Sequence, residues 1–242
     1  MQLVIDIGNT RIKAALFDGD ELMHSFVFDS PEAFLSSGIT GNYPIEHCIL
    51  ASVVDGIEAC VEALKKNFPV LAFSTDTITP LKNLYKSAQT LGSDRLAGAV
   101  GGNALFPDKN VLVIDAGTCI KYNFVNSSNE YMGGGISPGL QMRFKALHTF
   151  TSRLPLVDVD ENFQELIGKD SKESILSGVQ MGAVAEVEGI IERYKLQYPD
   201  VKVVLTGGDV NFFAERLKNS IFADQFLILK GLNRILKSNL IA

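Results

Sequence analysis

The sequence has few of the residues that build metal centres and disulfide frameworks. Its 242 residues include three cysteines and three histidines. Cys48, Cys60 and Cys119 are odd in number and widely spaced, which favours free thiols in a reducing compartment over a disulfide framework. The histidines have no ligand spacing, so a structural zinc site is not expected.

Basic charge and long apolar runs are also scarce. The formal net charge is -6 at pH 7, which argues against a nucleic-acid partner because such partners require a basic face. No segment approaches the roughly 18 consecutive apolar residues of a membrane span. The N-terminus has no basic region of the kind that begins a signal peptide. We therefore expect a cytoplasmic protein without membrane or nucleic-acid partners.

The remaining sequence predicts two halves built on one scheme. Hydrophobic residues make up 46% of the chain, enough for one large domain or two of ordinary size. Apolar runs and turn residues predict strands at 2–7, 11–17, 21–28, 47–54 and 70–74, with helices at 56–68 and 93–106. The second half predicts strands at 110–117, 119–125, 130–137 and 201–208, a long helix at 174–198, and a strand leading into a helix at 226–239. Glycines are costly inside a helix, so those in 93–106 predict close packing against another backbone.

Two turns of similar composition stand in matching places in the two halves. Residues 6–10 read DIGNT and residues 115–118 read DAGT. Glycine lets a ligand approach the backbone, and consecutive N–H groups in a tight turn form a concavity that binds anions. A carboxylate beside phosphates needs a cation, and Mg²⁺ held by few carboxylates and several waters meets that need. We expect a metal-bound polyphosphate here; the alternative is a plain hairpin turn, in which these residues are also common.

This duplicated arrangement resembles the superfamily of acetate and sugar kinases, heat-shock ATPases and actin. The resemblance implies an α/β fold of two duplicated actin-like (ribonuclease H-like) domains with mixed sheets, 1–107 and 108–242, and an ATP cleft between them. The segment LTGGDV at 205–210 is similar to the adenosine-side motif of that superfamily.

A denser match is carried by NLYKSAQTLGSDRLAGAVG at 83–101. Together with DIGNTRIK at 6–13, DAGT, and GGGISPGLQMRFKALHTFTSRLP at 133–155, it resembles the type III pantothenate kinases. That family phosphorylates the primary hydroxyl of pantothenate to 4'-phosphopantothenate, the first committed step of coenzyme A synthesis. The resemblance therefore implies ATP and pantothenate as substrates.

The GSDR motif carries the expected catalytic chemistry. A kinase acting on an alcohol needs a base near the hydroxyl, a phosphate cradle and a metal. The resemblance makes Asp94 the general base; by position alone it could be a helix N-cap or first-turn acid. Arg95 suits a carboxylate, which guanidinium binds in a fork, or it could be a surface residue capping Asp94. The implied substrate-binding residues are Tyr85 (otherwise a core residue), Gly92, Ser93, Asp94, Arg95 and Ser171.

The resemblance also implies the nucleotide and cation sites. The ATP-binding residues would be Asp6, Ile7, Gly8, Asn9, Thr10, Arg11, Ile12, Lys13 and Thr118. Asp6 would hold Mg²⁺ through water, and Asp115 would hold a monovalent cation, K⁺ or NH₄⁺. From the residues alone Mg²⁺ and K⁺ remain open for Asp115, because both are hard cations that take oxygen ligands.

In the family, the residue at the place of Ser171 reaches the substrate from the partner subunit of a homodimer. The family usually has threonine there, and proline where this chain has Ala88. Ser171 could also be a helix N-cap, with Ser174 three residues on in the place of the usual Glu or Gln of a capping box. We expect the GGGISPG segment to be more than a strand and to have no catalytic role. The helix expected at 136–150 has an apolar face that we expect to cover the partner subunit: Leu140, Phe144, Leu147 and Phe150.

Two other interpretations stay open. Another small-molecule kinase of the same superfamily is one, and GSDR combined with DIGNTRIK argues against it. A catalytically silent regulatory relative is the other. It should have lost Asp94 or the hairpin residues, all of which are present.

Overall fold

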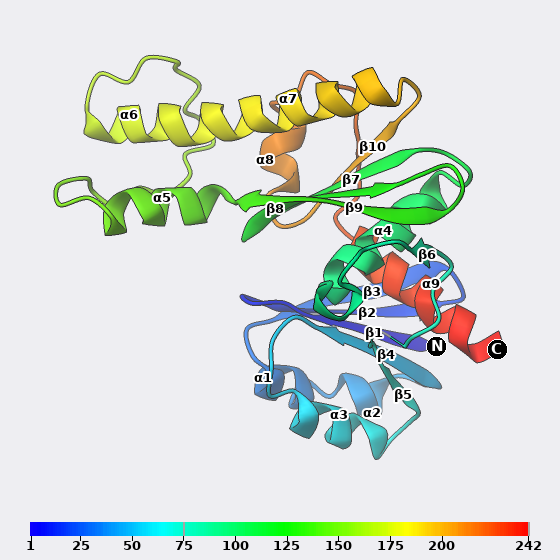
Figure 1. Cartoon of the computed structure of the whole chain (residues 1–242). Helices are drawn as coiled ribbons and strands as arrows, with labels where there is room; N and C mark the ends of the chain where they lie inside the picture. Colours follow the sequence, from blue (N-terminus) through cyan, green and yellow to red (C-terminus); the bar gives the residue numbers. More distant parts are fainter. Residues whose placement is uncertain (75, 242) are drawn as a thin grey trace. The chain divides into compact units, whose positions relative to one another are not determined.

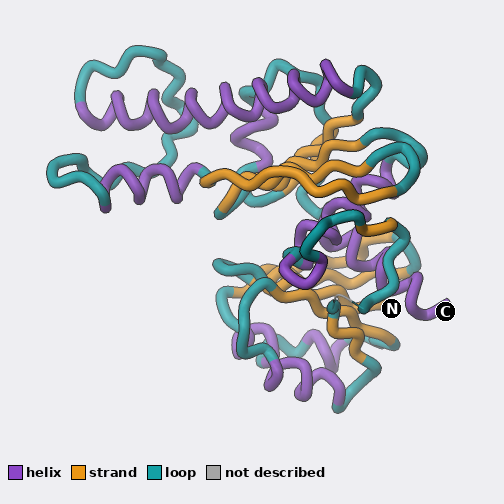
Figure 2. The backbone as a smooth tube through the Cα atoms, in the orientation of Figure 1, coloured by secondary structure: helices purple, strands orange, loops and turns teal. Residues whose placement is uncertain are grey.

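The computed structural model describes residues 1–74 and 76–241, which form two compact units. Unit 1 comprises residues 1–109 and 125–133 and the C-terminal residues from Phe226 onward; unit 2 comprises Asn110–Phe124 and Gly134–Gln225. Figure 2 shows that both units contain strands and helices. The chain first leaves unit 1 close to the expected boundary at 107/108 and later returns to it. The division into actin-like domains 1–107 and 108–242 stays a prediction.

Unit 1 contains a five-stranded mixed sheet with the order β3-β2-β1-β4-β5 (Figure 1). β1 pairs antiparallel with β2 and parallel with β4. Leu3 and Ile5 face one hydrophobic cluster, whereas Val4 faces another. Because both faces of the sheet are covered, β1 is a continuous apolar run, as expected of a buried strand. The strands are β1 (Gln2–Ile7), β2 (Ile12–Asp18), β3 (Glu21–Phe28), β4 (His47–Ser52) and β5 (Val70–Ala72).

A six-stranded sheet repeats this order, which is β11-β10-β7-β8-β9-β6. Taken from β9, the order β9-β8-β7-β10-β11 matches that of the first sheet. β10 pairs parallel with β7 and β11, as β4 pairs with β1 and β5. The predicted duplication is therefore confirmed at the level of topology. The strands are β6 (Lys82–Asn83), β7 (Val111–Ala116), β8 (Cys119–Val125), β9 (Glu130–Pro138), β10 (Lys202–Thr206) and β11 (Phe222–Ala223).

Helices cover both faces of the first sheet (Figure 1). One face packs against α1 (Pro31–Leu35), α2 (Ile39–Asn42) and α3 (Glu58–Lys65). The other face packs against α4 (Ser93–Leu105), which follows the 3₁₀ helix η1 (Ala88–Thr90), and against α9 (Leu227–Ile241). The predicted close approach of the α4 glycines is confirmed. A Cβ on Gly101 would lie 2.5 Å from the carbonyl oxygen of Leu227, and one on Gly231 would lie 1.9 Å from that of Ala97.

The strand expected at the start of 226–239 is wrong, because these residues begin α9. The apolar residues of this segment continue at helical spacing rather than alternating. Most of them are leucines, which are unbranched at Cβ, and α9 packs against α4 in one hydrophobic cluster. The fully buried members are Leu227, Leu229, Leu232, Ile235 and Leu236.

In unit 2 a long helix runs along the second sheet (Figure 1). It is continuous over the 27 residues Ser171–Gln197 and consists of α6 (Ser171–Leu176), the π-helical segment η2 (Ser177–Met181) and α7 (Gly182–Gln197). By length and composition it is the one helix of the described residues that could cross a membrane, but 44% of its most apolar window is buried inside the protein, as in a core helix. The other helices of unit 2 are α5 (Leu140–Thr149) and α8 (Val210–Ala214).

Two expectations about the 133–150 region need correction. The glycine-rich segment is strand through Pro138, although Gly133 and Gly134 have φ of 103° and 155°. The helical face expected to cover a partner subunit is largely internal, because Leu140 and Phe144 are buried in the core of unit 2. Sequence shows that a helix face is apolar, but not whether its own sheet or a second chain covers it.

Candidate active site

The first predicted phosphate-binding turn forms the tip of the β1–β2 hairpin in unit 1. Asp6 is 8% exposed and pairs in register with Lys13 across the two strands. The Gly8 N–H donates a hydrogen bond to the Arg11 carbonyl oxygen at 3.0 Å, which closes the hairpin. Asn9, Thr10 and Arg11 are exposed. The turn therefore presents polar groups and backbone at its tip above a nearly buried carboxylate.

The start of α4 is fixed at the carboxyl ends of the strands that carry this hairpin. The Ser93 hydroxyl donates to the carbonyl oxygen of Ser52 at 3.1 Å. Ser52 is the last residue of β4 and pairs in register with Ile7, the last residue of β1. The N-terminus of a helix attracts anions through its unpaired N–H groups and its dipole. Within unit 1, the GSDR motif and the DIGNT turn are thus brought to the same edge of the sheet.

Asp94 is the second residue of α4 and is 9% exposed. Its Oδ1 accepts a hydrogen bond from the N–H of Arg95 at 2.7 Å. A Cβ on Gly92 would lie 2.7 Å from the same oxygen, so a larger residue at 92 would displace the carboxylate. Asp94 is therefore a first-turn acid, held by the helix in one orientation. That placement is compatible with a role as general base.

Arg95 lies in the first turn of α4, next to Asp94, and is only 5% exposed. The alternative that it is a surface residue is therefore wrong. Its guanidinium carbon lies 5.3 Å from the centre of the Tyr85 ring, and Nη1 lies 3.5 Å from the Tyr85 hydroxyl. A buried cation at a helix N-terminus is unfavourable for the helix dipole. A ligand anion beside the guanidinium would offset this cost.

Tyr85 lies beside this guanidinium and also packs against the hydrophobic core of unit 1, so its role as a substrate wall stays a prediction. It is half-buried, and its ring lies against Gly133, where a Cβ would come within 3.1 Å of Cδ2. The short strand β6 places it there, because Lys82–Asn83 pair in register with Glu130–Tyr131 of β9.

Unit 2 carries the second turn. Asp115 is the penultimate residue of β7, is in register with Thr206 of β10, and is 8% exposed. The Lys121 ammonium lies 3.0 Å from Asp115 Oδ2. Sequence reasoning missed this lysine, although the repeat held a signal for it. Lys13 pairs with Asp6 on the first hairpin, and Lys121 stands in the matching place on the second.

The LTGGDV segment packs directly on this turn. Gly207 has φ of 102°, and a Cβ there would lie 2.1 Å from the Ala116 carbonyl oxygen. The Asp209 N–H donates to that same oxygen at 2.9 Å. Burial, together with the charge of Asp115, raises the pKa of Asp209 to about 6. Two carboxylates are thus crowded at the end of the second sheet, as in a site that accepts positive charge.

In the absence of nucleotide and divalent metal, Asp209→Asn is expected to stabilise the folded protein at pH 8 but not at pH 4.5. The folded pKa lies above the unfolded value of about 3.9, so stability falls as pH rises from about 4 to about 6 and stays lower above that range. The gap between the folded and unfolded pKa values corresponds to roughly 3 kcal/mol in the free energy of unfolding. Solvent screening at this half-buried position reduces it to about 1–2 kcal/mol.

Urea unfolding at both pH values would measure the effect. The Asp209 side chain makes no capping hydrogen bond at the start of α8, so the substitution leaves that start intact. Asp200→Asn at an exposed position is the control. A loss of stability at pH 8, or an equal gain at both pH values, would contradict the assigned carboxylate repulsion.

Thr118 lies at the exposed tip of the second turn. Its carbonyl oxygen accepts a hydrogen bond from the Gly139 N–H at 3.1 Å, which fixes the start of α5 to the turn. A Cβ on Gly139 would lie 1.9 Å from the Gly117 carbonyl oxygen. The glycine-rich segment therefore joins the turn to α5, and the expectation that it has no catalytic role stays a prediction.

Ser171 is exposed at the start of α6. The alternative that it caps this helix is wrong. The N-cap is Asp170, whose side chain accepts from the Glu173 N–H at 2.8 Å, while Glu173 accepts from the Lys169 N–H at 2.8 Å. The Ser171 hydroxyl therefore does not cap α6.

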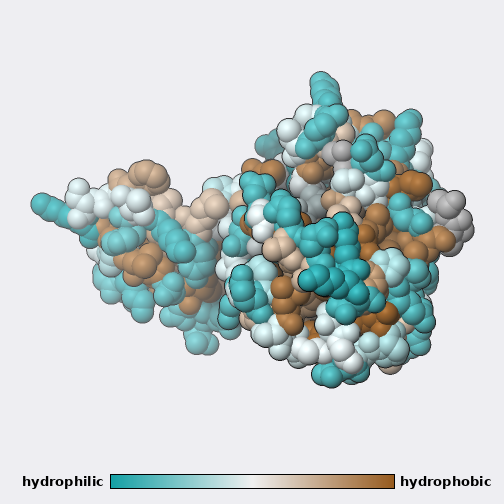
Figure 3. Space-filling view, turned by 90° about the horizontal axis from the view of Figure 1, so that it is seen from below, coloured by the Kyte–Doolittle hydropathy of each residue, from teal (hydrophilic) through white to brown (hydrophobic). Residues whose placement is uncertain are grey.

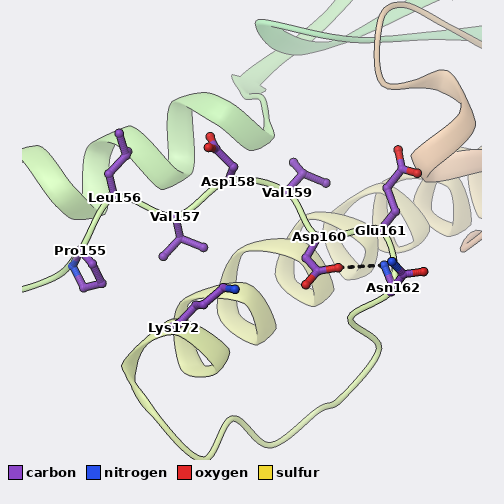
Figure 4. Close-up of a pocket in the computed structure, with 9 residues that line it drawn as sticks. All are labelled: Pro155, Leu156, Val157, Asp158, Val159, Asp160, Glu161, Asn162 and Lys172. Carbon is purple, nitrogen blue, oxygen red and sulfur yellow. Dashed lines mark hydrogen bonds between the residues drawn. The ribbon is translucent and has the colours of Figure 1, made fainter.

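A pocket of about 790 Å³ lies beside α6 in unit 2 (Figure 4). Its lining is mostly the loop before α6, and Lys172 projects toward that loop from the helix (Figure 4). None of the predicted nucleotide or substrate residues lines it. Its lining residues are Pro155, Leu156, Val157, Asp158, Val159, Asp160, Glu161, Asn162 and Lys172.

The two expected cations fit their sites differently. Among residues 1–74 and 76–241, no cluster of three or more His, Cys, Asp or Glu could hold a metal ion. A nucleotide-bound Mg²⁺ needs few protein ligands and keeps several waters. The single carboxylate of Asp6 is therefore enough for such an ion. At Asp115, by contrast, the Lys121 ammonium already contacts Oδ2, so a free monovalent ion there would lie next to a second positive charge.

Duplicated mixed sheets with a hairpin at the end of each first strand define an actin-like kinase and ATPase fold. Known structures agree: the chain is similar to a Baf family protein from Campylobacter jejuni (21% identity, TM-score 0.65, covering 99% of this chain and 100% of that one). It is also similar to a ROK family glucokinase from Streptomyces griseus (11%, TM-score 0.58, 98% and 99%).

Comparison with related sequences identifies the family within this fold class. The chain matches the type III pantothenate kinase family over residues 2–193. It is 48% identical over 242 residues to the type III pantothenate kinase of Bacteroides fragilis strain ATCC 25285, covering 99% of this chain and 98% of the relative. The corresponding protein of Phocaeicola vulgatus is 43% identical over 240 residues, with 99% of both chains covered. The chain belongs to the type III pantothenate kinase family.

Proposed function

We propose that the chain transfers the γ-phosphoryl group of ATP to pantothenate, giving 4'-phosphopantothenate in the first step of coenzyme A biosynthesis in the cytoplasm. The proposed phosphoryl transfer to pantothenate rests mainly on one observation. A nearly buried carboxylate, Asp94, and a nearly buried guanidinium, Arg95, are adjacent in the first turn of α4. Pantothenate offers a primary hydroxyl and one carboxylate, which correspond to a base and an arginine fork.

In the proposed reaction, Asp94 accepts the proton of the pantothenate hydroxyl as that oxygen attacks the γ-phosphorus in line. Arg95 binds the carboxylate of pantothenate and so fixes the distance between the hydroxyl and the base. Tyr85 supports the guanidinium from one side, and Gly92 and Ser93 hold the loop in place. Phosphoryl transfer depends largely on such positioning and on electrostatic stabilisation.

The nucleotide is assigned to residues of the two turns. Asp6, Ile7, Gly8, Asn9, Thr10, Arg11, Ile12 and Lys13 of the first turn, and Thr118 of the second, are the proposed ATP-binding residues. When bound, Mg²⁺ held by Asp6 through water would neutralise phosphate charge. Positive charge is also expected next to Asp115. K⁺ and NH₄⁺ are the free ions that the family resemblance implies there, and the Lys121 ammonium is the charge that the chain itself carries.

ATP consumption with and without pantothenate tests the function. We expect turnover to require pantothenate, with glucose, N-acetylmannosamine and acetate inactive as acceptors. A sugar that supported faster turnover than pantothenate would favour another kinase of the same fold. ATP hydrolysis unaffected by any acceptor would favour a regulatory ATPase.

The proposed homodimer rests on exposed apolar residues in the segment that joins α5 to α6. Phe150, Leu166 and Ile167 are 85%, 77% and 74% exposed. Brown apolar atoms are visible among hydrophilic ones at this end of unit 2, at the left of Figure 3. Exposed apolar groups of this size mark interaction surfaces. A second copy covering them would bring its surface to Ser171, which follows the same segment and is the proposed cross-subunit substrate contact.

Light scattering is expected to give the mass of a dimer at assay concentration, and Leu166→Asp combined with Ile167→Asp is expected to give a monomer that has lost most activity. Leu196→Asp is the matched control, because Leu196 is 84% exposed on α7, outside this segment. A wild-type monomer with full activity would refute the dimer and the role of Ser171 across it.

A further inference from the structure

The carboxylate of Asp115 is already paired with a positive charge that the chain supplies. Lys121 Nζ lies 3.0 Å from Asp115 Oδ2, and the two side chains are only 21% and 12% exposed. Lys121 extends from β8, which lies beside β7 in the sheet. This ion pair is therefore held between two neighbouring strands, unlike the surface pair of Lys65 with Glu62 on α3.

A lysine ammonium is chemically close to the free ions expected at such a carboxylate. It is an alkyl derivative of NH₄⁺, with one unit of charge and N–H donors that reach carboxylate oxygen at about 2.7–2.9 Å. A free cation on the same carboxylate would lie about 4 Å from Nζ. At that separation, repulsion weakens binding by roughly a thousandfold for an effective dielectric constant of about 20.

The oxygen atoms around the pair would suit a free ion if the ammonium were absent. Thr206 is in register with Asp115 on β10, and its hydroxyl oxygen is buried without a hydrogen-bond partner among the described residues. The Asp209 carboxylate is close enough to Asp115 for their charges to interact. Two carboxylates and a hydroxyl are ligands of the kind that hard monovalent cations take.

We infer that the Lys121 ammonium takes the place of the monovalent cation at Asp115, so that this chain works without K⁺ or NH₄⁺. Removing the ammonium should convert the protein into one that binds and requires such an ion. The activity part of this inference rests on the proposed function, whereas ion binding to the unliganded protein does not.

Thermal unfolding without substrates tests ion binding directly. For the wild type, replacing K⁺ by tetramethylammonium at constant ionic strength should leave the unfolding temperature unchanged. For Lys121→Ala, K⁺ and NH₄⁺ should each raise it by several degrees relative to tetramethylammonium, because ligands that bind only the folded state stabilise it. Lys65→Ala, which breaks an exposed ion pair of similar length, should behave like the wild type.

Turnover of ATP with pantothenate gives the second readout. Wild-type rates should agree within about twofold in K⁺ and tetramethylammonium. Lys121→Ala should lose roughly 10²-fold in tetramethylammonium, the size expected for one electrostatic group, and should regain most of it in K⁺, NH₄⁺ or methylammonium.

A tenfold or larger dependence of the wild type on K⁺, or a K⁺-dependent shift in its unfolding temperature, would overturn the inference even if Lys121→Ala did not fold. Lack of pantothenate-dependent turnover in every salt would instead refute the proposed function, and the unfolding measurements would still decide the role of Lys121.

Discussion

Asp94→Asn is expected to lower kcat by about 10²–10⁴-fold, which is the typical contribution of a general base. The amide cannot accept a proton at neutral pH, but its Oδ1 can still accept the Arg95 N–H, as the carboxylate does at 2.7 Å. The start of α4 should therefore keep its shape. Because Arg95, the proposed ligand of the substrate carboxylate, is unchanged, KM for pantothenate should change little. Steady-state kinetics and circular dichroism would measure both effects.

The matched control for this variant is Asp18→Asn, at an exposed position on β2. It should retain wild-type kcat. Nucleotide binding by Asp94→Asn, measured by calorimetry, should also be retained. Turnover by Asp94→Asn within a few-fold of the wild type would show that Asp94 acts only as a first-turn acid of α4.

Arg95→Ala should show the opposite balance, with a rise of roughly 10–100-fold in KM for pantothenate and a smaller loss of kcat. A hydrogen bond to a charged group contributes about 1.5–3 kcal/mol, and each 1.4 kcal/mol corresponds to a factor of ten. Arg95→Lys should give an intermediate KM, because it keeps the charge but not the planar fork.

Since Arg95 is buried against Tyr85, its loss could also act through packing. A substrate without the carboxylate separates the two causes. With pantothenol, in which an alcohol replaces the carboxylate, wild type and Arg95→Ala should have similar KM values. If Arg95→Ala raised KM equally for both substrates, Arg95 would support the fold rather than bind the carboxylate.

Much of the fold could be predicted because the signals are local. β1 and β7 are continuous apolar runs that end in an aspartate and a glycine turn, and this pattern appears twice. The helix α4 and its close packing against another backbone were both predicted, because glycines inside a helix are costly. The close approach of α9 offsets that cost. The short strand β6 has no such signal, since two residues that pair with a distant strand leave no periodic pattern.

The failures have a common cause, which is that tertiary contacts decide between locally equal choices. The start of α9 is apolar enough for a strand, and packing against α4 makes it helical. The apolar face of α5 is real, but the core of its own unit, which includes α6 and η2, covers most of it. At α6, Asp170 and Ser171 could both have served as N-cap, and the structure uses Asp170.

The residues of the candidate site also divide into those that the local sequence predicts and those that depend on tertiary contacts. Asp94 and Arg95 follow from a contiguous motif, so their proximity is visible in the sequence. The pair of Lys121 with Asp115 depends on which strand lies beside β7, and the sequence alone does not state that a lysine on the next strand reaches this carboxylate. Such cross-strand pairs become visible only when the two halves are compared residue by residue.

Product identification tests the central claim most directly. The wild-type protein would be incubated with Mg²⁺, γ-labelled ATP and pantothenate, and the products separated and identified by mass spectrometry and ³¹P NMR. The account predicts that the label appears in a phosphomonoester of pantothenate at its primary hydroxyl, in amounts equal to the ADP formed. Label found only in inorganic phosphate, at a rate independent of pantothenate, would contradict it.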